Sequence, residues 1–262
     1  MLRYLEATGE WVTNTVIDAG HAMTLLGKSL ARVPSSMGRV RAILRQTYIA
    51  GVQSLPVTML VGVFSGMILA LQSGLTLRDF HLERLVGTLV LVSMCRELGP
   101  FMTAFILSGR VGSAMAAELG TMAVSEEIDA LRVMSIDPVK FLVLPRFLAL
   151  TIFAPIITIY ANILGVIGGA IVAKYQIGVE YSMYFDNLME TLKQNDLDLI
   201  YGGLVKSMVF GTTIAVVACS LGLRARNGAE GVGEAARKSV VYNFLLILVF
   251  NYILSSIIQR YW

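Results

Sequence analysis

Long apolar stretches, separated by short charged segments, dominate the chain from residue 46 onward. A helix needs about 20 apolar residues to cross ~30 Å of hydrocarbon. Five stretches meet this requirement, at residues 50–73, 85–109, 147–171, 199–223 and 239–259. The pattern therefore predicts an all-α integral membrane protein with five membrane-spanning helices.

The composition supports this prediction. The residues AVILMFWYC make up 56% of the chain and charged residues only 15%, whereas soluble domains carry about 25% charged residues. So few polar side chains cannot cover the core of a soluble protein of this length. The net charge of +3 is too small to indicate a nucleic-acid-binding face, so we expect no nucleic-acid partner.

The first 45 residues have a different character from the rest. Apolar side chains recur at helical spacings among charges over residues 1–32, which predicts an amphipathic helix lying in the membrane interface. A plain soluble N-terminal helix fits the same residues equally well. No repeat or linker divides the chain, so residues 1–262 are expected to form one domain, with an interfacial segment (1–45) and a five-span region (46–262).

The distribution of basic residues orients the spans. With the N-terminus in the cytoplasm, the cytoplasmic segments hold 14 Lys and Arg residues and the outer segments hold 5. Cytoplasmic loops carry the excess of Lys and Arg. The bias therefore predicts a cytoplasmic N-terminus and a C-terminus on the opposite side.

Two charges, Arg96 and Glu97, lie in the middle of the second predicted span. A charge at that depth costs about 2.5–3.5 kcal/mol, so each is expected to face a cavity or a partner. Two interpretations remain open, a structural ion pair or the polar edge of a substrate cavity. Gly99 and Pro100 predict a kink just after them. Lys206 lies near one end of its span and is expected to extend toward the headgroups.

The segment 118–138 combines acidic and apolar residues in a predicted cytoplasmic connection. Ser125 is expected to cap a helix there, and Asp137 with Pro138 to end it. The segment carries an apolar stripe of Val124, Ile128, Leu131 and Met134 or Ser135, and the acidic residues Glu118, Glu126, Glu127 and Asp129. Such a helix suits a groove in a soluble partner; a helix on the membrane surface is the alternative.

Small residues predict where spans approach each other. Gly62 and Gly66 are four positions apart in the first span, and Gly165 and Gly169 in the third. This spacing permits close contact between helices.

The residues give no sign of metal or catalytic chemistry. His21 and His81 are 60 positions apart and cannot form a zinc motif, and Cys95 and Cys219 lie in separate apolar runs. We therefore expect no metal, no cofactor and no catalytic site on this chain.

The sequence Arg-Glu-Leu-Gly-Pro at residues 96–100, followed by the acidic segment 118–138, resembles the MlaE-type permease subunit of MCE-associated ABC transporters. The similarity covers residues 46–262 and is most specific over 96–138. It implies a homodimer in the bacterial inner membrane whose C-terminus is periplasmic. It also implies a cytoplasmic ATPase, which supplies the ATP and Mg²⁺ chemistry and binds through a coupling helix at about residues 119–136. An MCE-domain ring on the periplasmic face and a STAS-domain protein are the other implied partners.

The implied cargo is phospholipid, moved between the inner membrane and the outer-membrane route to maintain lipid asymmetry. A site for it should be an apolar cavity with a few polar groups. The candidates are Leu69, Leu71, Leu75, Leu77, Phe80, Met94, Leu98, Phe250 and Leu254, with Gln72, Arg96 and Glu97 as polar groups. Plain packing within the bundle is the alternative for each aliphatic residue.

A self-contained secondary transporter is the main alternative function. It would need intramembrane carboxylates for ion coupling and usually an internal repeat. Glu97 is the sole acidic residue in the five predicted spans, and no repeat is evident. An intramembrane enzyme and a generic ABC importer permease fit the residues less well.

Overall fold

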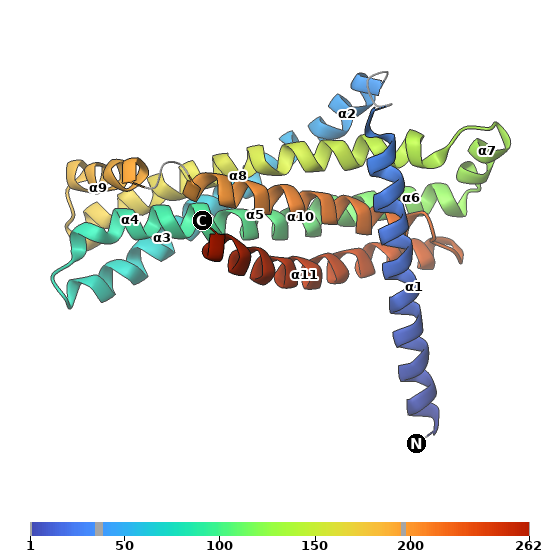
Figure 1. The fold of residues 1–262 in the computed structure, drawn as a ribbon, viewed down its shortest axis with the longest axis horizontal. Coiled ribbons are helices and arrows are strands. Elements are labelled where there is room, and N and C mark those ends of the chain that lie inside the picture. The colour runs from blue at the N-terminus through green and yellow to red at the C-terminus, as the bar shows by residue number, and fades with distance from the viewer. Residues whose placement is uncertain (1, 35–38, 195–197, 262) are drawn as a thin grey trace.

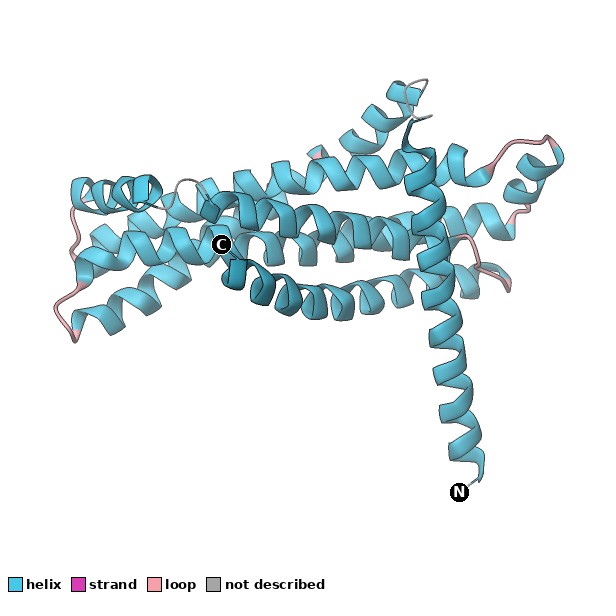
Figure 2. Cartoon of the chain, in the orientation of Figure 1, coloured by secondary structure: helices cyan, strands magenta, loops and turns pink. Residues whose placement is uncertain are grey.

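The computed structural model describes residues 2–34, 39–194 and 198–261, and this part of the chain consists of helices joined by short loops, with no strand (Figure 2). The elements, in order, are α1 (Leu2–Arg32), α2 (Val40–Ala50), η2 (Val52–Ser54), α3 (Leu55–Arg78), η3 (Glu83–Leu85), α4 (Val86–Ser93), η4 (Met94–Leu98), α5 (Gly99–Leu107), η5 (Ser108–Gly112), α6 (Ser113–Val124), α7 (Glu127–Val133), η6 (Val139–Val143), α8 (Leu144–Val172), η7 (Ala173–Ile177), α9 (Tyr181–Gln194), α10 (Asp198–Gly222) and α11 (Gly228–Tyr261).

Five helical segments of the described chain are long and apolar enough to cross a membrane, which confirms the all-α fold and the number of spans. They are Val40–Arg78, Glu83–Val124, Val139–Ile177, Asp198–Gly222 and Gly228–Arg260. The predicted boundaries of several spans were too short. The second segment has 42 residues, or about 63 Å of helix at 1.5 Å per residue, twice the thickness of the hydrocarbon. It therefore continues beyond the bilayer through residues that the sequence assigned to a cytoplasmic connection.

The spans lie side by side along the long axis of the molecule, with α10 near the centre and α11 along one edge (Figure 1). The most apolar stretch of α10 is 72% buried within the chain, whereas that of α11 is 11% buried. The largest core cluster gathers around Leu150, Phe210 and Ile214. Because so little of this stretch of α11 is buried within the chain, most of its apolar side chains must contact lipid or another protein.

The first and third spans meet through small residues, as the glycine spacing predicted. A Cβ atom at Gly66 would lie 1.9 Å from the carbonyl oxygen of Gly165, so only hydrogen fits at this contact. The buried side of α3 consists of Thr58, Gly62, Gly66, Ala70 and Gly74. The opposite side of α3 carries large exposed apolar residues, including Leu60, Phe64 and Ile68. The helix therefore packs closely on α8 with one face and leaves an apolar face open.

The N-terminal helix α1 runs across the bundle instead of along it (Figure 1). The predicted helix at residues 1–32 is confirmed by α1. Its second half is fixed to the bundle by ion pairs of Asp18 with Arg224 and of Arg32 with Asp137. Exposed apolar side chains remain on it, namely Val16, Ile17, Met23 and Leu30. The position of this helix in the membrane interface stays a prediction.

Helix α9 lies in a connection where the sequence indicated no element. Tyr184 is fully buried against α4 and α8, and its hydroxyl donates to the Val166 carbonyl oxygen at 3.1 Å. Burial raises the pKa of the Tyr184 hydroxyl above its usual range. The helix closes the end of the bundle opposite α7.

Candidate transport site and coupling segment

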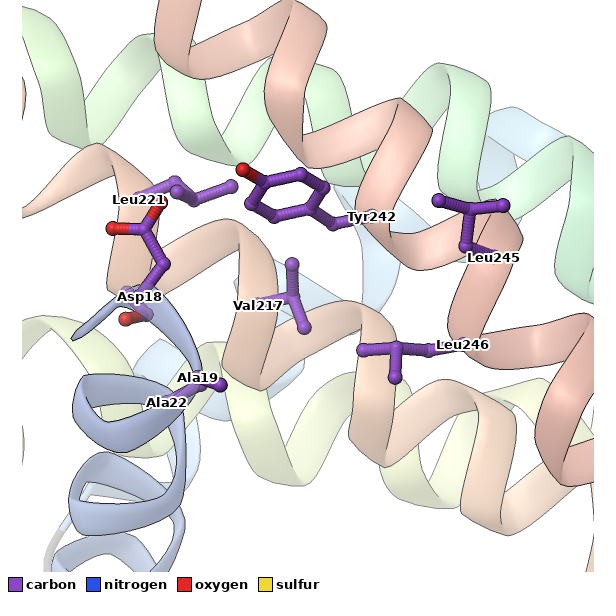
Figure 3. A pocket seen from close by; sticks show the side chains of 9 residues that line it. Asp18, Ala19, Ala22, Val217, Leu221, Tyr242, Leu245 and Leu246 are labelled. Carbon is purple, nitrogen blue, oxygen red and sulfur yellow. The ribbon is translucent and has the colours of Figure 1, made fainter. Parts of the chain in front are cut away.

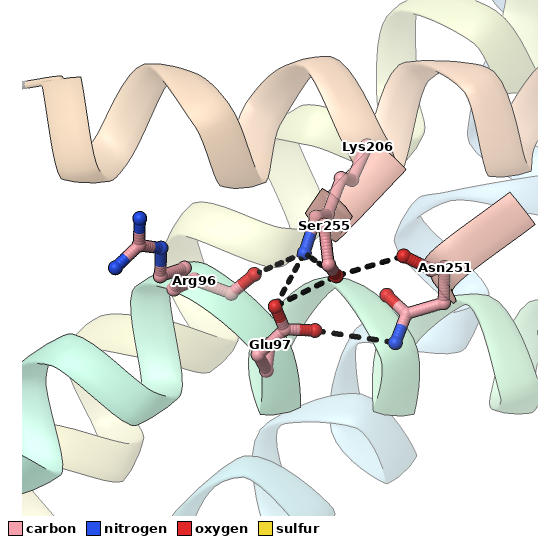
Figure 4. Close-up of polar contacts among 5 residues, drawn as sticks. All are labelled: Arg96, Glu97, Lys206, Asn251 and Ser255. Atoms are coloured by element: carbon pink, nitrogen blue, oxygen red, sulfur yellow. Dashed lines mark hydrogen bonds and ion pairs between the residues drawn. The ribbon is translucent and has the colours of Figure 1, made fainter. Parts of the chain in front are cut away.

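A polar cluster joins three spans at the middle of the second one (Figure 4). Lys206 on α10 donates from Nζ to Glu97 Oε1 at 2.7 Å and to Ser255 Oγ at 2.7 Å. Asn251 on α11 donates from Nδ2 to Glu97 Oε2 at 3.2 Å. Ser255 Oγ also lies 2.8 Å from Glu97 Oε1. The carboxylate of Glu97 is thus bound by side chains from two other spans.

The backbone of the second span is irregular at this point, and this makes room for Lys206. The predicted irregularity at Gly99 and Pro100 takes the form of a π-helical segment, η4, which ends directly before them. Pro100 has no N–H to donate to the carbonyl of residue 96, four positions earlier. The Nζ atom of Lys206 donates to that carbonyl oxygen at 2.9 Å instead. The lysine therefore satisfies an acceptor that the proline leaves open.

A close helix contact lets Lys206 reach so far. A Cβ atom at Gly203, one turn before Lys206, would lie 1.9 Å from the carbonyl oxygen of Cys95. Because glycine has no side chain, α10 can lie directly against η4. The three N–H groups of the Lys206 ammonium then find three acceptors, and its side chain is 0% exposed.

The prediction that Lys206 extends toward the headgroups is therefore wrong. The sequence showed only a lysine near the end of an apolar run, and such a side chain can usually extend to the interface. The Lys206 side chain instead points into the bundle, where it forms an ion pair with Glu97. Asn251 and Ser255 were also missed, since a single amide and a single hydroxyl in an apolar helix carry no pattern. The available signal was that Lys206 is the one basic residue in the predicted spans besides Arg96.

Arg96 and Glu97 point in different directions, as expected for neighbouring helical residues. Figure 4 shows the Arg96 guanidinium directed away from the cluster. Within the described part of the chain this guanidinium makes no hydrogen bond or ion pair, and the side chain is half-buried. Glu97 keeps 35% of its side chain exposed. The site therefore presents a fixed carboxylate with one open side, next to a cation without an internal partner.

The structure divides the apolar cavity candidates into three groups. On α3, Leu71, Gln72, Leu75 and the following Phe80 are exposed. Five others are partly buried and pack against core clusters, namely Leu69, Leu77, Leu98, Phe250 and Leu254. Met94 is fully buried and lies where a side chain on Gly165 would be, so its contacts are those of bundle packing.

The helix that follows the polar cluster, α5, contacts the two spans that are least covered. Helix α5 contacts both α3 and α11. The most apolar stretches of the first and fifth spans, to which these helices belong, are only 28% and 11% buried within the chain. Phe105 of α5 is exposed there and stacks edge-on against Phe244 of α11, with ring centroids 4.9 Å apart. This part of the bundle surface therefore carries exposed apolar side chains about two turns along the second span from Glu97.

The acidic segment differs from the single helix that the sequence predicted. Helix α6 ends at Val124, and α7 covers only Glu127–Val133. Ser125 does not cap α7, because its hydroxyl donates back to the Thr121 carbonyl oxygen at 2.9 Å. Glu126 precedes α7 with a φ of 60°, in the left-handed region. This residue reverses the chain, and the helix therefore cannot continue from 119 to 136.

Helix α7 has one buried and one exposed face. Ile128 is buried in a core cluster and Leu131 packs against it. Met134 was expected on the same stripe and is exposed, because the helix ends before it. The carboxylates of Glu126, Glu127 and Asp129 are exposed, and Glu127 and Asp129 lie in the first turn, where the helix dipole favours them. The end of the bundle thus presents an acidic surface.

Glu118 belongs to the bundle and is not part of α7. Its Oε2 atom lies 2.9 Å from Nη2 of Arg146, whose side chain is almost fully buried. Arg146 also donates from Nη1 to the Leu142 carbonyl oxygen at 2.7 Å. This pair ties α6 to the start of α8, directly behind the acidic surface.

In the part of the chain that the structure describes, no three His, Cys, Asp or Glu residues gather as metal ligands would. Cys95 and Cys219 are buried as free thiols in different spans. The chemistry that this arrangement offers is ion pairing and burial of apolar surface.

Comparisons with known proteins agree with these features. The profile of the family Permease MlaE matches residues 43–257. A probable ABC transporter permease protein of Rickettsia typhi is 39% identical over 218 residues, 83% of either chain. The intermembrane phospholipid transport system permease protein MlaE of Haemophilus influenzae is 32% identical over 257 residues, 98% of either chain. Protein TRIGALACTOSYLDIACYLGLYCEROL 1, chloroplastic, of Arabidopsis thaliana is 33% identical over 248 residues, 94% of this chain and 70% of its own.

Proposed function

The chain belongs to the MlaE permease family, and we propose from this premise that it is the membrane-spanning permease subunit of an ABC transporter that moves phospholipid between the inner membrane and the outer-membrane route. Its five apolar helices and its relatives fit a multi-pass protein of the inner membrane. The proposed role is maintenance of lipid asymmetry in the outer membrane.

The observation that carries the proposal is the half-open polar cluster among the membrane-spanning helices. A phospholipid needs apolar walls for its tails and a few polar groups for its headgroup. The exposed side chains of α3 and the partly buried Phe250 and Leu254 of α11 supply such walls on either side of α5. Glu97 and Arg96 supply the polar groups, because the first has an open side and the second lacks an internal partner.

The cavity is completed by a second copy of the chain. An apolar span that is only 11% buried within its own chain leaves a surface suited to another protein. In the homodimer, ten spans enclose lipid between the faces formed by α3, α5 and α11. The distribution of basic residues supports a cytoplasmic N-terminus and a periplasmic C-terminus.

Hydrolysis of ATP belongs to a partner subunit that holds the nucleotide and Mg²⁺. The acidic surface of α7 docks in a groove of this ATPase, and closure of two ATPases moves α7 as a rigid body. Coupling requires α7 to contact the ATPase differently in its nucleotide states. The motion tilts the first and last spans and narrows the cavity, so that lipid passes to or from an MCE-domain ring on the periplasmic face. A STAS-domain protein binds the ATPase.

Charge reversal on α7 tests the docking. Glu126→Lys together with Glu127→Lys should abolish co-purification of the ATPase, or leave hydrolysis insensitive to lipid. Glu180→Lys with Asp186→Lys is the matched control, since these exposed carboxylates lie at the opposite end of the bundle. Normal assembly and normal lipid-stimulated hydrolysis in the α7 variant would exclude α7 as the docking element.

A second experiment separates this function from a self-contained secondary transporter. The purified chain, reconstituted alone with an ion gradient, should move no lipid. The engagement of Glu97 with Lys206 supports this expectation, because a carboxylate held by a lysine is a poor ion-coupling group. Gradient-driven transport without an ATPase would support the secondary transporter instead.

A further inference from the structure

Four basic side chains from three separate elements line one pocket at the end of the bundle that carries α7. His21 and Lys28 come from α1, Arg132 from α7, and Arg224 from the connection between α10 and α11. The pocket has a volume of about 220 Å³. The remaining lining residues are Thr24, Leu25, Val139, Ser220 and Leu223. No carboxylate is among the described residues that line it, so the pocket is a site of concentrated positive charge and hydroxyl groups.

The carboxylates near the pocket occupy only some of the N–H donors of its basic side chains. Asp18 engages Nη1 of Arg224, and Asp129 engages Nη1 of Arg132, whereas each guanidinium has five N–H donors. The ammonium of Lys28 has no ion pair within the described chain. Lys28 lines the pocket and is exposed. The pocket therefore keeps donors for an anion in addition to its internal pairs.

A second pocket lies on the other flank of α1 (Figure 3). Its walls are apolar and include Ala22 of α1, Val217 of α10, and Leu245 and Leu246 of α11. Both pockets touch Ser220. Val217 lies about one helical turn deeper in its span than the residues of the basic pocket. Helix α1 thus has an apolar pocket on one flank and the basic pocket on the other, the two surfaces that the tails and the phosphate of a lipid need.

We propose that this pocket binds the phosphate group of an anionic membrane lipid. The lipid phosphate accepts hydrogen bonds from Lys28, Arg132 and Arg224 together, and it links α7 to α1 and to the end of α10. Phosphate oxygens are the acceptors that guanidinium and ammonium groups prefer. A consequence for coupling rests on the proposed function of α7: the bound lipid holds α7 in place for the ATPase.

This site is separate from the transport cavity. Ser220 in the pocket and Lys206 in the polar cluster are both on α10, 14 positions apart, which corresponds to about 21 Å along the helix. A lipid bound here is therefore a resident of the cytoplasmic leaflet and not the transported cargo.

The test measures lipid binding by the full chain in mild detergent, using phosphatidylglycerol as the anionic probe and phosphatidylcholine as the neutral one. Wild type should bind phosphatidylglycerol more tightly than phosphatidylcholine. Lys28→Gln should lower the phosphatidylglycerol affinity about fivefold, the usual effect of one basic residue near a membrane surface. Lys28 forms no internal ion pair, so this variant should unfold at the wild-type temperature.

Arg41→Gln is the matched control, because it removes the same charge from an exposed position on α2 outside the pocket. Unchanged phosphatidylglycerol affinity in Lys28→Gln, or an equal loss in Arg41→Gln, would overturn the proposal. Inorganic phosphate that binds as tightly as phosphatidylglycerol would also overturn it, because the ligand would then be free phosphate.

An acidic surface of a partner protein is the remaining occupant to exclude. If Lys28→Gln abolished ATPase co-purification and left phosphatidylglycerol binding intact, the pocket would be a protein contact and the lipid assignment would be wrong. Because the binding measurement uses the chain alone, failure of the proposed coupling function would not alter its outcome.

Discussion

Two ion pairs of the same length show how strongly their surroundings decide what they do. Lys206 and Glu97 in the middle of the spans are 2.7 Å apart, and so are Arg132 and Asp129 on α7. The side chains of the first pair are 0% and 35% exposed, and those of the second are 64% and 66% exposed. Water screens the second pair far more than the first, in which only Glu97 is partly exposed. The inner pair is therefore a structural requirement, whereas the outer pair can exchange partners.

The two pairs also differ in what they connect. The inner pair joins the second, fourth and fifth spans through Ser255 and Asn251. The outer pair links two residues of one seven-residue helix. Loss of the first changes how spans pack, and loss of the second changes only the local charge of α7. This contrast fits a rigid site in the bilayer and an adaptable surface for partners.

The largest expected effect comes from breaking the inner pair. Lys206→Met leaves Glu97 without its cation at bilayer depth, and removal of one member of a buried pair costs about 3–5 kcal/mol. Thermal unfolding in mild detergent, followed by circular dichroism, should show a large drop in Tm. The double variant Lys206→Met with Glu97→Gln should recover most of it. Equal losses in the single and double variants would show that the lysine acts through packing and not through charge.

A smaller effect is expected from the contact between the first and third spans. Gly66→Ala places a methyl group against the Gly165 carbonyl oxygen and should cost about 1–3 kcal/mol as overpacking. Gly109→Ala is the control, since a Cβ atom there meets nothing within 4 Å. Both changes favour helix equally. A similar Tm for the two variants would contradict the close contact.

An intermediate pair lies between the two extremes. Glu118→Gln removes the carboxylate that pairs with the buried Arg146, but Glu118 itself is half-exposed. Because water reaches one partner, we expect a loss of about 1 kcal/mol, below the cost of breaking the inner pair. The same thermal unfolding measurement checks this. A loss as large as that of Lys206→Met would show that exposure of one partner does not weaken a pair here.

Much of the fold was predictable because hydrophobic periodicity and length are local properties. The five spans follow from long apolar runs with few or no charges, and the contact of α3 with α8 follows from Gly62, Gly66 and their counterparts in the third span. The true length of the second span was not predictable, because charged residues such as Arg110 and Glu118 suit a helix end in water as well as a loop.

The site was predictable only in part. Arg96 and Glu97 stood out because charges in a span are costly. Their partners could not be read from the sequence, since Lys206 and Ser255 reach Glu97 only when α10 and α11 pack against η4. A helix start after Ser125 was expected, but the way the chain breaks there was not, because Glu126 adopts a left-handed conformation that glutamate rarely takes.

The smallest effect is expected at the outer pair and completes the contrast. Asp129→Asn removes the carboxylate that pairs with Arg132, and both side chains are largely exposed to water. Exposed pairs of this kind contribute about 0–0.5 kcal/mol to the free energy of unfolding. The unfolding temperature should therefore match that of wild type. Asn keeps the size of the side chain, so only the charge is tested. A clear drop in Tm would mean that the α7 pair supports the bundle, and the division between a rigid inner pair and an adaptable outer pair would no longer hold.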